Sequence, residues 1–270
     1  MNALTNHPPT RRPSPIARAL LALLTAFGLV AGTAVLPASA TPPSAYVGLG
    51  DSIAAGTGGS DYVDATCLRT AEAYPTQLGG LNNACFGATT SIVVQTQLGA
   101  LNGAVRRVSV TVGANDIGSG QVAAACMSAP QSTTCQQALA KSLFVDLPQL
   151  PGKIRTMITA IRAKAPNAAI VLTGYPRLFT VSPTEPVIQR TMEDTINYAT
   201  DLLNTTIATS AYANGTSFSS VTWAFIGHGI GSAAPWIHSP RDTTNQLEWF
   251  HPNDSGYTLG YVPAVRPYVQ

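Results

Sequence analysis

Four short blocks of the sequence carry residue types that can perform nucleophilic chemistry together. Ser52 follows an apolar run in a Gly-Asp-Ser block, Gly87 stands in Phe-Gly-Ala-Thr, Asn115 in Gly-Ala-Asn-Asp, and His251 in Trp-Phe-His-Pro. A serine hydroxyl becomes a nucleophile when a histidine with a pKa near neutrality takes its proton. A glycine N–H and an asparagine amide can donate hydrogen bonds to the oxyanion that forms when a carbonyl is attacked. The set therefore predicts serine attack on a carbonyl carbon.

Taken singly, each of these residues also has a plain structural interpretation. Ser52 suits the N-cap of a helix, Gly87 an ordinary turn, and Asn115 a turn or a helix cap. The block around Ser52 is not the G-x-S-x-G motif of α/β-hydrolases, because Ala54 stands where that motif requires glycine. The chemical interpretation depends on finding all four residues in one chain.

Three histidines follow residue 40, and each is a candidate base. His228 follows an apolar run, His238 lies in a loop region, and His251 precedes Pro252, which restricts the backbone there. We expect His251 to be the base, with His228 and His238 as alternatives. Their spacing does not match a metal-ligand pattern, so we expect no metal.

Strand-like and helix-like segments alternate along the chain, and the candidate residues follow strand-like ones. Four short apolar runs predict buried strands: 46–49, 108–112, 168–173 and 221–226. Apolar residues at three- and four-residue steps predict helices over 154–165 and 187–211. This alternation indicates an α/β protein with a mainly parallel sheet, in which ligands bind beyond the carboxyl ends of the strands.

The first forty residues have the pattern of a secretory signal peptide. Three arginines precede the apolar run 19–36, which is followed by Pro-Ala-Ser-Ala, with small residues one and three places before a cut after Ala40. The alternative is a permanent membrane anchor, for which the run is near the lower length limit. We expect 1–40 to be removed and 41–270 to form a single catalytic domain of a secreted, extracellular protein.

The composition excludes several classes of protein. Hydrophobic residues make up 45% of the sequence and charged residues only 10%, which excludes a disordered chain and a coiled coil. Three of the 15 basic residues and none of the 13 acidic ones precede residue 41, which leaves 12 against 13. A nearly neutral domain without a basic cluster is not expected to bind nucleic acid.

The four cysteines are expected to form two disulfides. An even number of cysteines in an exported chain favours disulfides. We expect the neighbouring pairs Cys67–Cys85 and Cys126–Cys135, because each pair brackets a loop rich in Gly, Ala or Ser. A zinc site is disfavoured, since no two of these cysteines form a C-x-x-C pair.

Taken together, the four blocks resemble the SGNH-hydrolase family, also called GDSL esterases and lipases. The resemblance covers about 46–268, and stretches 174–179 and 235–238 resemble its secreted actinobacterial lipase/esterase branch. It implies a three-layer α/β/α sandwich, flavodoxin-like, with about five strands. It also implies Ser52 as nucleophile, His251 as general base, and an oxyanion hole formed by the N–H groups of Ser52 and Gly87 and the side chain of Asn115.

The residue that orients the histidine departs from the family pattern. The family usually has Asp three residues before the histidine, where this chain has Glu248. Three possibilities remain open: the Glu248 carboxylate, the main-chain carbonyl at that position, or another acid such as Asp242. We expect Glu248 to be the third catalytic residue.

The substrate is the least constrained part of the prediction. We expect a carboxylic ester or lipid, no cofactor, no permanent membrane anchor and a monomer. Phospholipase A and polysaccharide acetyl esterase are alternatives within the family, and a secreted binding domain that lost catalysis is the alternative outside enzymes. The Ala- and Ser-rich stretch 121–134 has no apolar face large enough for a lid. Five aromatic residues are candidate pocket walls: Phe86, Tyr175, Phe179, Trp236 and Trp249.

Overall fold

A parallel sheet of five strands forms the centre of the protein. The structure is a computed structural model that describes residues 45–270, apart from the side chain of Ser128. The strand order is β4-β1-β5-β6-β7, and every neighbouring pair is parallel. The strand bounds are Leu81–Asn82 for β4, Tyr46–Gly50 for β1, Arg107–Thr111 for β5, Ala169–Thr173 for β6 and Ser217–Ser219 for β7. The switch in strand order falls beside β1, where the first candidate block begins.

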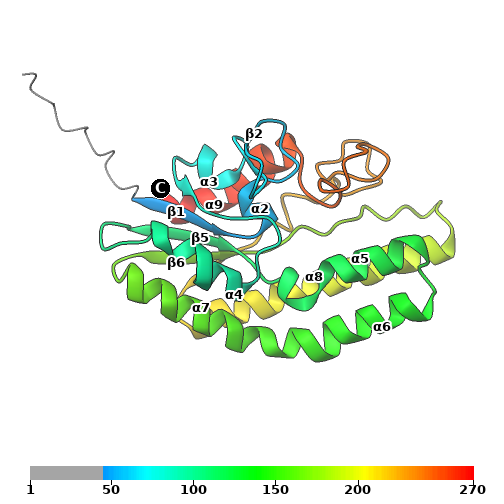
Figure 1. Cartoon of the computed structure of the whole chain (residues 1–270). Helices are drawn as coiled ribbons and strands as arrows, with labels where there is room; N and C mark the ends of the chain where they lie inside the picture. The colour runs from blue at the N-terminus through cyan, green and yellow to red at the C-terminus, as the bar shows by residue number, and fades with distance from the viewer. Residues whose placement is uncertain (1–44) are drawn as a thin grey trace, which may run out of the picture. The chain divides into compact units, whose positions relative to one another are not determined.

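Helices cover both faces of the sheet, as a parallel sheet requires. Short α3 (Tyr74–Gln77) and α9 (Val262–Val269) lie on one face, and α4 (Thr90–Ile92), α7 (Leu150–Lys164) and α8 (Val187–Ala213) lie on the other (Figure 1). Helix α7 buries a stripe at three- and four-residue steps against the core. The predicted three-layer α/β/α sandwich is confirmed, as are the two long helices.

The remaining elements lie around the carboxyl ends of the strands or connect the layers. They are helices α2 (Ser52–Ala55), α5 (Ser119–Ser128) and α6 (Thr133–Lys141), a small antiparallel pair β2 (Tyr62–Asp64) and β3 (Arg69–Thr70), and short 3₁₀ or π turns η1 (Val93–Gln97), η2 (Leu98–Ala100), η3 (Asn115–Ile117), η4 (Ser142–Asp146), η5 (Leu147–Gln149) and η6 (Gly256–Tyr261). Helices α5 and α6 form a hairpin that continues through η4 and η5 into α7.

The predicted strand over 221–226 is wrong. The last strand of the sheet is β7, at Ser217–Ser219, and 221–226 forms turns. Val221 and Phe225 are buried, but Trp223 is 81% and Ile226 is 61% exposed. Burial four residues apart is the spacing of one helical turn, and strand alternation does not produce it. The sequence also missed β4, which is only two residues long.

The expected signal peptide, 1–40, lies outside the described residues. The described residues belong to one compact unit, 43–270. Among them, no helix combines the length and the apolar character needed to cross a bilayer.

Candidate active site

Ser52 stands at the sharp turn between β1 and α2. Asp51 is the N-cap of α2, and its Oδ1 accepts a hydrogen bond from the Ile53 N–H at 3.0 Å. Ser52 is therefore the first helical residue rather than the cap. At Gly50, φ is +130°, and a Cβ would lie 2.0 Å from the Thr111 carbonyl oxygen, so only glycine fits. Glycine lets the chain turn sharply here, and the serine hydroxyl lies at the carboxyl end of β1.

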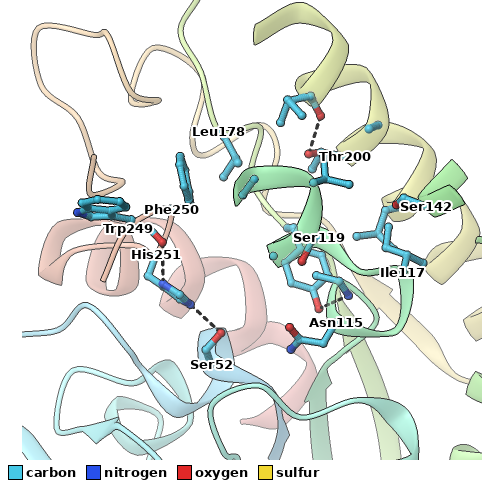
Figure 2. A pocket seen from close by; sticks show the side chains of 18 of the residues that line it. Ser52, Asn115, Ile117, Ser119, Ser142, Leu178, Thr200, Trp249, Phe250 and His251 are labelled. Atoms are coloured by element: carbon cyan, nitrogen blue, oxygen red, sulfur yellow. Dashed lines mark hydrogen bonds between the residues drawn. The ribbon is translucent and has the colours of Figure 1, made fainter. Parts of the chain in front are cut away.

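His251 contacts Ser52 directly, from a loop near the C-terminus. Its Nε2 lies 2.7 Å from Ser52 Oγ, and its Nδ1 lies 3.0 Å from the Trp249 carbonyl oxygen (Figure 2). A carbonyl oxygen only accepts, so Nδ1 carries the ring proton and Nε2 is free to accept the serine proton. Burial lowers the pKa of His251 to about 4, against a weaker opposing effect of the Trp249 carbonyl. The ring is thus neutral at neutral pH, as a base must be.

The carboxylate of Glu248 does not hold the histidine ring in the structure. Its oxygens accept hydrogen bonds from Thr243 Oγ1 at 2.9 Å and Asn245 Nδ2 at 2.8 Å. The Glu248 main-chain carbonyl accepts from the backbone N–H of His251 at 3.0 Å, and it also acts to raise the pKa of the His251 ring. Asp242 instead accepts from Ser239. The carbonyl hydrogen-bonded to Nδ1 belongs to Trp249, one residue beyond the expected position, and neither the Glu248 carboxylate nor Asp242 contacts the ring in the structure.

Phe250 has a strained backbone conformation. It lies between Trp249, whose carbonyl accepts the hydrogen bond, and His251, whose ring donates it. Its φ is +66°, in the left-handed region that bulky side chains rarely occupy. Such a conformation costs about 1–2 kcal/mol. The reversal brings the Trp249 carbonyl and the His251 ring, two residues apart, within hydrogen-bond distance.

Gly87 and Asn115 enter the same site from the loops after β4 and β5. Both line the pocket that contains Ser52. Gly87 has φ +75°. One N–H of the Asn115 side chain is donated to the Ala88 carbonyl at 3.0 Å, which holds the two loops together. An amide has two N–H groups, so the second remains available for a ligand.

Asp116 holds the loop after β5 to the loop after β4, a role that the sequence did not reveal. Its oxygens accept from the Thr90 N–H at 2.8 Å and from Thr90 Oγ1 at 2.7 Å, and Lys153 Nζ lies 3.8 Å away. The Asp116 side chain is almost fully buried. A carboxylate in the residue after Asn115 therefore anchors the turn that presents the asparagine.

The other two histidines do not reach Ser52. His228 stacks on Trp236, with ring centroids 3.8 Å apart, and its Nδ1 contacts the Ala234 carbonyl. His238 Nε2 donates to the Gly58 carbonyl at 2.8 Å, which joins the His251 loop to the segment after α2. His238 is therefore a structural neighbour of His251.

An apolar pocket of about 270 Å³ begins at these residues. Beyond Asn115 its wall comes from α5, the end of α6 and α8, and Figure 2 shows Ser119, Ser142 and Thr200 on that side. None of its described lining residues is a lysine, an arginine or a glutamate. Of the five aromatic residues predicted as walls, four line it: Phe86, Tyr175, Phe179 and Trp249. The fifth, Trp236, packs on His228 and Phe225 instead.

Both expected disulfides are present, one at each end of the site. Cys67–Cys85 braces the loop that leads to Gly87, and the Phe86 N–H donates to the Cys67 carbonyl. Cys126–Cys135 joins α5 to α6. Cys126 itself lines the pocket, so this disulfide is part of the wall. No cysteine in the described part of the chain is free.

Asp51 and Tyr175 form a buried pair directly behind the serine. The Tyr175 hydroxyl donates to Asp51 Oδ2 at 2.5 Å. Burial raises the pKa of Asp51 to about 7, although the hydrogen bonds from Tyr175 and from the Ile53 N–H act in the opposite direction. The sequence indicated Tyr175 only as a wall residue, and no local motif marks its contact with a residue 124 positions away.

The arrangement has the parts of a serine nucleophile site, with a base, two loops that offer N–H donors, and an apolar pocket. Residues 45–270 contain no group of three or more His, Cys, Asp or Glu side chains placed to hold a metal ion.

Comparison with known proteins agrees with this geometry. Residues 49–259 match the GDSL-like Lipase/Acylhydrolase family. The chain is 34% identical to Lipase 1 of Streptomyces coelicolor, over 92% of this chain and 97% of the relative, and 31% identical to a lipase of Streptomyces rimosus, over 94% and 97%.

Two solved structures are similar throughout. The extracellular lipase from Streptomyces rimosus has a TM-score of 0.76 at 31% identity, covering 83% of this chain and 98% of that one. Phospholipase A1 from Streptomyces albidoflavus NA297 also has a TM-score of 0.76, at 33% identity, covering 84% and 99%. The family resemblance predicted from the four blocks is confirmed: the chain belongs to the GDSL-like lipase/acylhydrolase family and is an ester hydrolase.

Proposed function

We propose that the chain is a secreted carboxylic-ester hydrolase that works through an acyl-enzyme on Ser52. The observation that carries the proposal is the 2.7 Å contact between Ser52 Oγ and His251 Nε2 at the end of an apolar pocket. In the first step, Nε2 takes the serine proton while Oγ bonds to the ester carbonyl carbon. His251 then gives this proton to the leaving alcohol, and the acyl group stays on Ser52.

The second half of the reaction uses the same two residues. A water gives its proton to His251 Nε2 and bonds to the acyl carbon, the carboxylic acid leaves, and Ser52 Oγ takes the proton back. In both halves the negative charge develops on the carbonyl oxygen. The N–H groups of Ser52 and Gly87 and the second N–H of Asn115 would stabilise it, and one such donor typically contributes 10²–10³-fold in rate.

The positive charge that forms on His251 has a neutral partner in this proposal. The Trp249 carbonyl orients the ring through Nδ1. Hydrogen bonds between a cation and a neutral oxygen are weaker than those to a carboxylate. We therefore assign Trp249, by its backbone, the role that we expected Glu248 to have.

The pocket suits a fatty acyl chain. On α8, four lining residues follow one another at three- and four-residue steps: Met192, Ile196, Ala199 and Leu203. Eleven residues of helix span about 16 Å, and an extended alkyl chain advances about 1.25 Å per carbon. A cavity of about 150 Å³ binds one benzene ring, and the pocket volume is about 270 Å³. The length corresponds to about thirteen carbons and the volume to about eleven, so both figures favour acyl chains of roughly ten to thirteen carbons over acetyl groups.

Triacylglycerol and phospholipid remain two substrate classes for the same pocket. The similarity to phospholipase A1 from Streptomyces albidoflavus supports phospholipid as a candidate substrate class. The mostly apolar lining, which holds no lysine, arginine or glutamate, favours a substrate recognised by its acyl chain rather than by a headgroup. Release of dodecanoic acid from tridodecanoylglycerol and from didodecanoyl phosphatidylcholine, in matched mixed micelles, would rank the two.

Secretion is supported by the pattern of 1–40, by the two disulfides and by the similarity to an extracellular lipase. All residues of the proposed mechanism come from one chain, which supports a monomer. N-terminal sequencing of the exported protein should begin at Thr41. A protein that keeps residues 1–40 and stays in the membrane would contradict this part of the proposal.

Hydrolysis of p-nitrophenyl esters from acetyl to palmitoyl tests the chemistry and the pocket together. We expect kcat/KM to peak near decanoyl or dodecanoyl. Ser52→Ala should abolish hydrolysis of every ester, while binding of the esters persists. Retention of the wild-type rate by Ser52→Ala would refute the nucleophile, and a peak at acetyl would refute the acyl pocket.

Ala199→Phe gives a second arm, because it fills the pocket from α8 without touching Ser52. We expect the optimum to move to shorter esters, with the acetyl ester cleaved as before. Ala213→Phe, at an exposed position at the end of the same helix, is the matched control and should leave the series unchanged.

A further inference from the structure

Tyr175 is a buried residue on which three parts of the site meet. Its hydroxyl donates to Asp51 Oδ2 at 2.5 Å and accepts from the Ala114 N–H at 3.2 Å. Its backbone is held on α8 by Asn204, which accepts from the Tyr175 N–H at 2.8 Å and donates to the Tyr175 carbonyl at 2.8 Å. The side chain is therefore fixed at both ends.

The two partners of the hydroxyl are the immediate neighbours of proposed catalytic groups. Asp51 precedes Ser52, and Ala114 precedes Asn115. One oxygen atom thus joins the turn that presents the nucleophile to the loop that presents an oxyanion donor. A misplacement of about 1 Å between such groups can reduce a rate by about 10²-fold.

The contacts of the hydroxyl argue against a direct role in the chemistry. Its single proton is directed at Asp51, and its oxygen already accepts the Ala114 N–H. It has no second proton to offer to an oxyanion. The ring lines the pocket, but the hydroxyl belongs to the support behind the site.

We propose that Tyr175 is a positioning residue that sets the distance between Ser52 and the oxyanion donor Asn115. This inference rests on the proposed function, since it assigns Tyr175 a role in that reaction. It makes the buried Asp51–Tyr175 pair part of the catalytic geometry rather than only of the core.

Tyr175→Phe tests the proposal, because it removes the hydroxyl and keeps the ring. We expect kcat to fall about ten- to a hundredfold for short and long esters alike, with KM changed less than twofold. The affinity for an alkyl trifluoromethyl ketone, which forms an oxyanion on reaction with serine, should fall by the same factor as kcat/KM. A purely structural role would lower the melting temperature without this parallel loss.

Tyr46→Phe is the matched control. The Tyr46 hydroxyl is also buried, 2.7 Å from Ser109 Oγ, but it lies at the other end of β1 from Ser52. We expect kcat and ketone affinity to stay at the wild-type values. If Tyr175→Phe fails to fold, Asp51→Ser keeps a capping oxygen for the Ile53 N–H, removes the oxygen that accepts from Tyr175, and should give the same parallel loss.

Each outcome decides the matter. Wild-type kcat and ketone affinity in Tyr175→Phe, with Ser52→Ala inactive, would overturn the inference and leave the proposed function intact. A KM effect confined to long esters would also overturn it, because Tyr175 would then be a pocket wall. Activity in Ser52→Ala would instead overturn the proposed function itself.

Discussion

The two ends of the pocket are held in different ways. At the sheet end, Ser52 and Asn115 follow β1 and β5, whose apolar side chains belong to the main hydrophobic core, and Gly87 follows the short strand β4 beside them. At the far end, α5 and α6 pack through a separate small cluster of three buried residues, Val122, Cys126 and Cys135, against Met192 and Ile196 of α8.

This difference teaches which property each end controls. The sheet end is fixed by the core and by short-range backbone contacts, such as the Trp249 carbonyl on the His251 ring. The far end depends on few apolar contacts and one covalent link. Elements with few buried contacts open at lower free energy. We therefore expect changes at the sheet end to alter kcat, and changes at the far end to alter chain-length preference.

The largest effect should come from His251→Ala. Without Nε2, no group takes the serine proton, and removal of such a base typically lowers kcat by 10⁴-fold or more. Steady-state hydrolysis of the decanoyl ester measures it. His228→Ala, a change in a histidine that stacks on Trp236 away from Ser52, should leave kcat within about twofold. Equal losses in the two variants would mean that the base is misassigned.

Removing each of the two disulfides should have a smaller effect on catalysis, and the two removals should change different kinetic constants. Replacing Cys126 and Cys135 with serine removes a cross-link worth about 3 kcal/mol in the chain-entropy model. We expect α5 and α6 to exchange amide hydrogens faster, and KM for the dodecanoyl ester to rise about tenfold. The acetyl ester should be cleaved at the wild-type rate, because the sheet end is unchanged.

The matched variant at the sheet end replaces Cys67 and Cys85 with serine. These cysteines brace the loop before Gly87, and the Cys85 N–H donates to the Gly50 carbonyl at 3.0 Å. We expect kcat to fall for every ester length, with little change in chain-length preference. If both double variants gave the same pattern, the division between the two ends would be wrong.

The sequence predicted the sheet end well because its groups stand in contiguous blocks at strand ends. Gly50 and Ser52 sit in one block, and a parallel sheet brings such blocks to one edge. The strand prediction for 221–226 failed because an apolar run of that length also fits a turn with two buried residues. Length alone does not separate the two.

The far end and the histidine's partner could not be predicted in the same way. Helix α5 is rich in alanine and serine and shows little amphipathic character, so its sequence does not mark it as a pocket wall. The partner of His251 Nδ1 is a backbone carbonyl, which no residue type signals. It depends on the left-handed backbone of Phe250, a conformation that a phenylalanine does not predict.

The pH dependence of kcat/KM should report the half-buried His251. Burial lowers the pKa of His251 to about 4, so the base stays neutral as pH falls from 7 to about 5, and activity should halve near pH 4. The positive charge of His238 acts in the same direction and the Glu248 carboxylate in the opposite one, both less than burial. Assay at pH 7 after brief acid exposure separates titration from unfolding. An acid limb near pH 6.5 would mean that the ring is solvated in the free enzyme.

The smallest effect should come from Glu248→Gln, and it decides how the histidine is oriented. The Glu248 carboxylate contacts Thr243 and Asn245, and Gln keeps an oxygen for one of them. With the Trp249 carbonyl on Nδ1, we expect kcat/KM to stay within about threefold at pH 7. In a serine protease triad, neutralising the aspartate lowers kcat by about 10⁴-fold. A loss of that size here would mean that the carboxylate swings onto the ring during catalysis, so that this part of the sheet end is set by a mobile side chain rather than by backbone.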